Sequence, residues 1–175
     1  MSINKDKAIQ ILGKAKRQYK DEIDQQVESR EVLSFLLGSE LYSFETKSVR
    51  EIIKPQIIYK VPTTPGYLLG VMNLRGEIFG VVNLKKFLDI SEVSDEENQR
   101  IVVASERITM GFVVDFVIDI LNIPGSQIQP PLSTIEKKKV DYFEGEVVME
   151  DNKLLSIINL EKLLNSEEIR NPSGK

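Results

Sequence analysis

Residues 70–88, GVMNLRGEIFGVVNLKKFL, predict two short strands, a tight turn and a short helix. The runs on either side of Arg75 and Gly76 are rich in apolar and β-branched residues, which favour strands. Glycine adopts the positive φ angles of a tight turn without strain, so a hairpin is expected about Arg75–Gly76. Residues 85–88 predict the helix. Arg75 is the unusual residue, because it places a guanidinium group in a segment otherwise typical of a protein core.

The same order of elements occurs a second time in the chain. VVNLKKFL (81–88) aligns with IINLEKLL (157–164) at an offset of 76 residues, and the expected turn at Gly38–Ser39 aligns with Glu106–Arg107 at an offset of 68. The offset changes in loops, so we interpret the chain as an internal duplication. Further matched pairs are Phe44 with Phe112, Val49 with Val117, Glu51 with Asp119, Ile52 with Ile120, Tyr67 with Tyr142, and Gly70 with Gly145.

The duplicated unit predicts a mainly β fold. Each copy has a hairpin, a strand, a proline-rich loop, a second hairpin and a short helix, and its five or so strands have the length that closes into a small barrel. A unit of this size buries little surface alone, so the two units are expected to share a hydrophobic core. Long loops are expected at 54–66 and 122–139, each with three prolines.

Arg75 distinguishes the two copies. The second copy has Asp151 in its place, whereas the acid at Glu51 is roughly kept as Asp119. A residue needed only to shape the turn should occur in both copies, so Arg75 is expected to serve something specific to the first. The planar guanidinium can hold a carboxylate and still donate outward. We therefore expect Glu51 to hold Arg75 for a partner; a surface turn residue with no further role is the alternative.

Residues 5–28 predict an amphipathic helix. Its apolar positions recur every three or four residues with charged residues between them. Such a helix either packs on its own domain or binds or links to a partner, and the sequence leaves both open. The apolar positions are Ala8, Leu12, Ala15, Tyr19, Ile23 and Val27.

Composition excludes several kinds of protein. The chain has no cysteine and no histidine, which removes thiolate nucleophiles, imidazole bases and zinc sites built on these residues. No catalytic residue, metal or cofactor is expected. A net charge of −4 disfavours nucleic acid as a partner. No apolar run approaches the roughly 20 residues that span a bilayer, and the N-terminus lacks a signal-peptide core, so a cytoplasmic protein without direct membrane insertion is expected.

Four segments together resemble the CheW-like domain of bacterial chemotaxis coupling proteins. They are VREII (49–53), TPGYLLGVMNLRGEIFGVVNLKKFL (64–88), GFVVDFVIDIL (111–121) and YFEGEVVMEDNKLLSIINLEKLL (142–164). The resemblance covers residues 31–168, with the N-terminal helix (1–30) and a C-terminal tail (169–175) outside it. It implies two intertwined five-stranded SH3-like β-barrels with a core between them. The chain departs from the family at Gly80, where proline is common, and at Asn83, where aspartate is common.

The resemblance also implies a function and a site. Proteins of this family are not enzymes; they are adaptors that join the cytoplasmic hairpin of methyl-accepting chemoreceptors to the regulatory domain of a CheA-like histidine kinase, which has the same fold. The acid of the V-x-E-I block and the arginine of N-L-R-G matter for coupling, and here they are Glu51 and Arg75. The groove between the barrels is expected to take the receptor hairpin. Residues expected to line or shape this groove are Val49, Gly70, Gly111 and Val117.

The sequence also leaves other functions open. The same adaptor could serve a kinase pathway for surface motility, pili or development. A ligand-binding barrel or an enzyme would require a pocket with convergent polar groups. A nucleic-acid-binding barrel would require a basic face with exposed aromatic residues.

Overall fold

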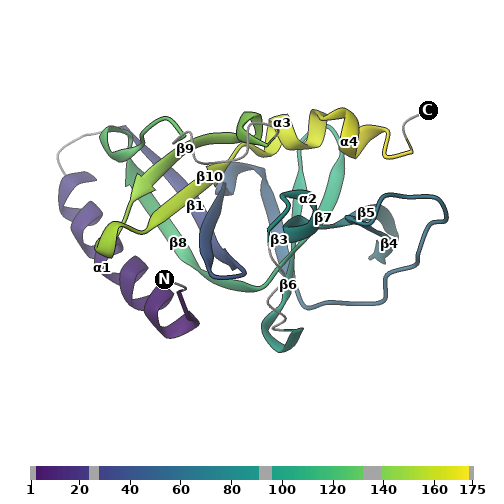
Figure 1. Ribbon diagram of the computed structural model, residues 1–175, viewed down its shortest axis with the longest axis horizontal. Coiled ribbons are helices and arrows are strands. Elements are labelled where there is room, and N and C mark those ends of the chain that lie inside the picture. Colours follow the sequence, from purple (N-terminus) through teal and green to yellow (C-terminus); the bar gives the residue numbers. More distant parts are fainter. Residues whose placement is uncertain (1–2, 24–27, 91–95, 132–138, 174–175) are drawn as a thin grey trace.

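Two five-stranded sheets hold most of the chain in the computed structural model, which describes residues 3–23, 28–90, 96–131 and 139–173 (Figure 1). We call the sheets barrel A and barrel B. Barrel A contains, in order across the sheet, β8 (Phe116–Pro124), β1 (Ser29–Leu37), β2 (Glu40–Glu45), β10 (Leu154–Ile158) and β9 (Phe143–Val148). Barrel B contains β3 (Val49–Ile53), β6 (Arg100–Ser105), β7 (Thr109–Val114), β5 (Glu77–Asn83) and β4 (Leu68–Leu74). The helices are α1 (Lys5–Ile23), α2 (Leu84–Phe87), α3 (Leu160–Asn165) and α4 (Glu167–Arg170).

The two sequence repeats exchange strands. Barrel A takes β1 and β2 from the first repeat and β8–β10 from the second, and barrel B takes the remaining three strands of the first repeat and two of the second. Each barrel contains one parallel pair, in which Ile157 lies opposite Ser43 and Val81 lies opposite Gly111. These two pairs are related by the repeat offsets of 76 and 68. The expected intertwined pair of barrels is therefore confirmed, with the repeats related by an approximate two-fold symmetry.

The core that joins the barrels is aromatic. Phe44 packs between Phe35 and Phe112, with ring centroids 4.8 Å and 5.6 Å apart. Phe44 and Phe112 are matched residues of the two repeats, and both are fully buried. The shared core predicted from the repeat is thus formed by equivalent side chains of both copies. A second apolar cluster lies under α1 in barrel A, and a third fills barrel B.

Several element boundaries differ from those expected. The helix predicted for 5–28 is α1, which ends at Ile23; residues 24–27 lie outside the described part, and β1 begins at Ser29. The loop expected from 122 begins later, because β8 pairs with β1 as far as Pro124. Ile169, expected in the C-terminal tail, is buried in the shared core. It lies in α4, a helix separate from α3. The Ser166 side chain caps α4 by accepting a hydrogen bond from the Ile169 backbone N–H.

Gly70 fixes the path of the proline-rich loop. Its φ is +142°, and a Cβ at this position would lie 2.1 Å from the carbonyl oxygen of Tyr59. Tyr59 and Val71 exchange two backbone hydrogen bonds of 2.8 Å and 2.9 Å, which hold the loop along β4. Gly70→Ala should therefore lower the free energy of unfolding by about 2–3 kcal/mol, measured by urea denaturation. Gly66→Ala is the control, because no atom apart from those of residues 65–67 lies within 4 Å of its added Cβ. Equal stability of the two variants would contradict this account.

Candidate functional site

Arg75 occupies a strained position in the β4–β5 turn. Leu74 and Glu77 form the last pair of the hairpin, so Arg75 and Gly76 are its two turn residues. Their φ angles are +52° and +88°, the type I′ pattern, in which Asn-Gly is strongly preferred. A left-handed conformation costs a non-glycine residue about 1–2 kcal/mol, and asparagine tolerates it best. Turn geometry alone therefore does not explain an arginine here.

Glu51 holds Arg75, as the sequence predicted. The Arg75 Nη1 donates to Glu51 Oε1 at 3.1 Å, across the gap between β3 and the β4–β5 hairpin. Arg50 makes a parallel link, with its Nη1 2.6 Å from Glu77 Oε2 and its Nε 3.7 Å from Glu51 Oε1. Hydrogen bonds from Arg50 and Thr109 lower the pKa of Glu77 below its usual range. Four side chains of alternating charge therefore lie together at this end of barrel B. We call them the charged end: Arg75, Glu51, Arg50 and Glu77.

The charged end leaves Arg75 available to a partner. Its side chain is 74% exposed, whereas that of Glu51 is 21% exposed. An exposed ion pair contributes about 0–1 kcal/mol, which at most offsets the strain of the left-handed turn. Arg75 therefore adds little to folding, and a guanidinium fixed by one carboxylate is preorganised to donate its other N–H groups outward.

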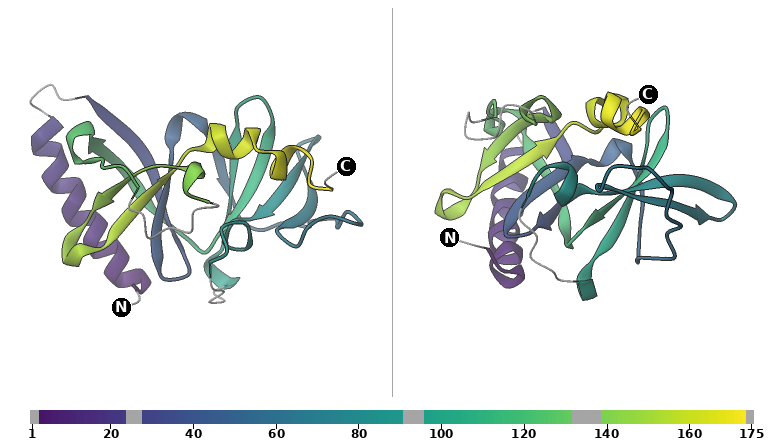
Figure 2. Two further views of the ribbon diagram at one scale, coloured as in Figure 1. Left: turned by 45° about the horizontal axis from the view of Figure 1, so that its top comes forward. Right: turned by 45° about the vertical axis from the view of Figure 1, so that its right-hand side comes forward.

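The equivalent end of barrel A explains why the second repeat lacks this arginine. Asp151 and Asn152 have φ angles of +59° and +56°, so the left-handed turn is kept. Asp151 Oδ2 binds Lys7 Nζ at 2.7 Å, and Asp119 Oδ2 binds Lys16 Nζ at 2.8 Å. Both lysines belong to α1, which lies along barrel A on the side away from the β4–β5 hairpin (Figure 2). The helix packs on its own domain, one of the two alternatives left open by the sequence.

Acid is expected to loosen α1. The ammonium groups of Lys7 and Lys16 hold the pKa of the Asp151 and Asp119 carboxyls below their usual range. A depressed pKa contributes stability above the unfolded-state value, and this contribution is lost as pH falls through the folded-state value. Amide protection factors in α1 should be constant between about pH 8 and pH 5 and should fall below about pH 4. Asp119→Asn/Asp151→Asn should lower the protection at neutral pH and flatten this dependence; an unchanged profile would contradict it.

The four residues expected at the groove occupy two different places. Val49 and Val117, equivalent residues of β3 and β8, pack against the core that joins the barrels. Gly111 instead faces the interior of barrel B, where a Cβ would lie 2.8 Å from Ile101 Cγ2. Gly70 faces the proline-rich loop, as described above. The two glycines therefore shape barrel B rather than line the seam between the barrels.

One buried ion pair at the seam was missed by the sequence reasoning. Lys85 Nζ lies 2.9 Å from Asp115 Oδ1, and both side chains are 6% exposed. The backbone N–H of Gly38, in the β1–β2 turn of barrel A, donates to Asp115 Oδ2 at 2.6 Å. Asp115 lies between β7 and β8 and Lys85 lies on α2, so the pair ties barrel B to barrel A. The available signal was a lysine directly after the apolar residue that begins a short helix.

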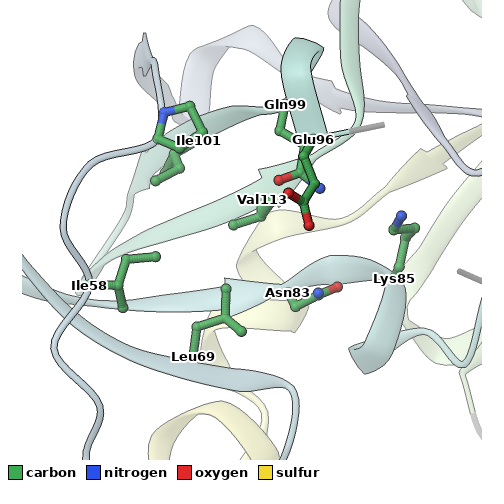
Figure 3. Close-up of a pocket in the computed structure, with 9 residues that line it drawn as sticks. Ile58, Leu69, Asn83, Lys85, Glu96, Gln99, Ile101 and Val113 are labelled. Atoms are coloured by element: carbon green, nitrogen blue, oxygen red, sulfur yellow. The ribbon is translucent and has the colours of Figure 1, made fainter. Parts of the chain in front are cut away.

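A cavity of about 240 Å³ opens beside Lys85 (Figure 3). Its walls combine apolar side chains with polar ones, and the Lys85 ammonium is already bound to Asp115. Within the described ranges no cluster of three or more potential metal ligands occurs. The lining residues are Pro55, Ile58, Leu69, Asn83, Lys85, Glu96, Gln99, Ile101 and Val113.

Comparison with known proteins assigns this chain to a protein family. The sequence model of the CheW-like domain matches residues 31–168, which include both barrels and the charged end. The chain belongs to the CheW-like family. A CheW chemotaxis protein of Thermotoga maritima is 32% identical over 144 residues, covering 82% of this chain and 92% of the relative. A CheW protein of Treponema pallidum is 28% identical over 148 residues, covering 82% and 86%.

A solved structure supports the same assignment. The crystal structure of the scaffolding protein TtCheW from Thermoanaerobacter tengcongensis superposes with a TM-score of 0.70 at 30% identity, covering 85% of this chain and 97% of that one. This CheW-like protein is therefore a chemotaxis adaptor. None of its helices in the described ranges is long and apolar enough to cross a membrane.

Proposed function

We propose that this CheW-like adaptor joins the cytoplasmic hairpin of chemoreceptors to the regulatory domain of a histidine kinase, in the cytoplasm and without catalysing a reaction. In this proposal Arg75, positioned by Glu51, is the principal coupling residue. The observation that carries the proposal is the Arg75 side chain itself: it is exposed, it is held by a carboxylate at 3.1 Å, and it stands in a turn where asparagine would be less strained.

The seam between the barrels supports the receptor part of the proposal. Val49 and Val117 are only partly buried where they pack against the joining core, so apolar surface is available there. A receptor hairpin that lays an apolar face against this seam would be recognised in the manner of a helix in a groove. Gly70 and Gly111 would act indirectly, by keeping barrel B in shape.

Reconstitution tests the proposal. Receptor cytoplasmic fragments on vesicles and the intact kinase are mixed with the full chain, and kinase sedimentation and autophosphorylation are measured. The chain should be required for both, and Arg75→Ala should reduce both while the midpoint of thermal unfolding stays nearly unchanged. Arg17→Ala, an exposed arginine on α1, is the matched control and should behave as wild type. Unchanged kinase sedimentation and unchanged autophosphorylation with Arg75→Ala would overturn the role of this residue.

A further inference from the structure

The two barrel ends are equivalent by the internal repeat but are closed in different ways. In barrel B the edge strand and the hairpin meet directly through Glu51 and Arg75. In barrel A the matched residues are two acids, Asp119 and Asp151, which would repel each other. Each binds a lysine of α1 instead, and Lys7 and Lys16 are nine residues apart, which is about 13 Å along a helix. The helix therefore spans the gap that the Arg75–Glu51 pair closes in barrel B.

The side chains beneath α1 show that this end of barrel A is built to be covered. Next to the β1–β2 turn, Leu36 and Leu41 form a cross-strand pair that is buried under α1. The equivalent pair beside the β6–β7 turn of barrel B is Ser105 and Thr109, whose hydroxyl oxygens lie 3.2 Å apart. Apolar residues thus occur where the helix lies, and polar residues occur where no helix lies.

We propose that α1 permanently covers the end of barrel A that is equivalent to the charged end, so that the charged end of barrel B is the surface that meets the kinase's homologous domain. The contact between the charged end and the kinase rests on the proposed function. The covering of barrel A by α1 does not, because it can be tested on the chain alone. An uncovered barrel A would expose a contiguous apolar face, and a second copy of the chain carries the same face. Such a self-complementary patch associates as a symmetric dimer.

Undocking the helix tests its role as a cap. Leu12 is 1% exposed in the interface with barrel A, whereas Ile9 on the same helix is 47% exposed. A carboxylate at residue 12 cannot stay buried without a partner, so Leu12→Asp should release α1. Sedimentation should then show a concentration-dependent dimer, with the β-sheet circular dichroism retained. Ile9→Asp should remain a monomer. A folded Leu12→Asp chain that stays monomeric with an uncovered barrel A would overturn the proposal.

A milder variant tests the role of α1 as a cap if Leu12→Asp unfolds the whole domain. Lys7→Glu/Lys16→Glu replaces both ion pairs with like-charge repulsion and buries no charge, because both lysine side chains are about half exposed. Hydrogen exchange should accelerate at least several-fold in α1 and remain unchanged in β6 and β7. Equal acceleration throughout the chain would show that α1 opens only with the rest of the fold, and would overturn its role as a cap.

Binding of the isolated kinase regulatory domain to the full chain tests the assignment of the interface. Arg50→Glu at the charged end should raise the dissociation constant at least about tenfold, and Arg17→Glu on α1 should leave it unchanged. The opposite sensitivity would place the kinase on the α1 side and overturn the assignment. If the wild-type chain does not bind this domain, the proposed function and the assignment fail together, while the dimerisation measurement still decides the role of α1.

Discussion

Arg75→Glu is expected to weaken binding to the kinase regulatory domain by about 30-fold or more. The change removes a preorganised cation from the charged end and places a second carboxylate beside Glu51, 3.1 Å from the present Nη1. Truncation of a central arginine at an interface costs 2 kcal/mol or more, which corresponds to about 30-fold in affinity. Folding should change by less than about 1 kcal/mol, because Arg75 is exposed. Calorimetric titration and thermal unfolding of the same preparation measure the two quantities.

Two further variants separate binding from folding at this turn. Arg75→Asn removes the guanidinium but suits the left-handed φ of +52°, so it should unfold at the same temperature or higher and still lose affinity. Glu51→Lys should also weaken binding, and combining it with Arg75→Glu should recover part of the loss if the two side chains act as a pair. Wild-type affinity in Arg75→Asn would contradict the role of the guanidinium. Unfolding of Arg75→Glu would mean that the pair is structural.

The internal repeat made most of the fold predictable. Offsets read from matched residues such as Phe44 and Phe112 correspond to the registers of the two parallel strand pairs. The repeat could not show by itself that strands are exchanged between the barrels, since either arrangement buries the same apolar positions. Predicted strand boundaries were wrong where the pairing partner lies far away in sequence. For example, β8 continues to Pro124 because Ser29 of β1 lies opposite it.

The candidate site was predictable in part. The Arg75–Glu51 contact followed from comparing the two copies, because opposite charges occur together in one copy only. The reason for Asp151 did not follow, because the helix that binds it begins more than 140 residues earlier and its docking face is not set by local sequence. By resemblance, Gly111 was expected to line or shape the groove. The sequence could not show which, because the direction of its Cβ depends on strand register, which places it inside barrel B.

Lys85→Met is expected to cause the largest loss of stability, about 3–5 kcal/mol. Methionine fills a similar volume, but it leaves the buried Asp115 carboxylate without the Lys85 ammonium, while the Gly38 N–H still donates to Asp115 Oδ2. Removing one partner of a buried ion pair carries a penalty of this size because the other charge stays out of water. Urea denaturation followed by circular dichroism measures the change. Lys86→Met, at the exposed neighbouring position on α2, is the control and should shift stability by less than about 0.5 kcal/mol.

The double variant Lys85→Met/Asp115→Asn shows whether the charge is the cause. Asparagine is neutral and its side-chain oxygen can still accept from Gly38, so the double variant should be more stable than Lys85→Met alone. Additive losses would mean instead that the two residues act through separate packing contacts. The pair joins the β1–β2 turn of barrel A to α2 beside barrel B, so the seam between the barrels should open when it is broken. Hydrogen exchange in Lys85→Met should therefore accelerate first around Gly38 and Leu84, before the strands at the two barrel ends.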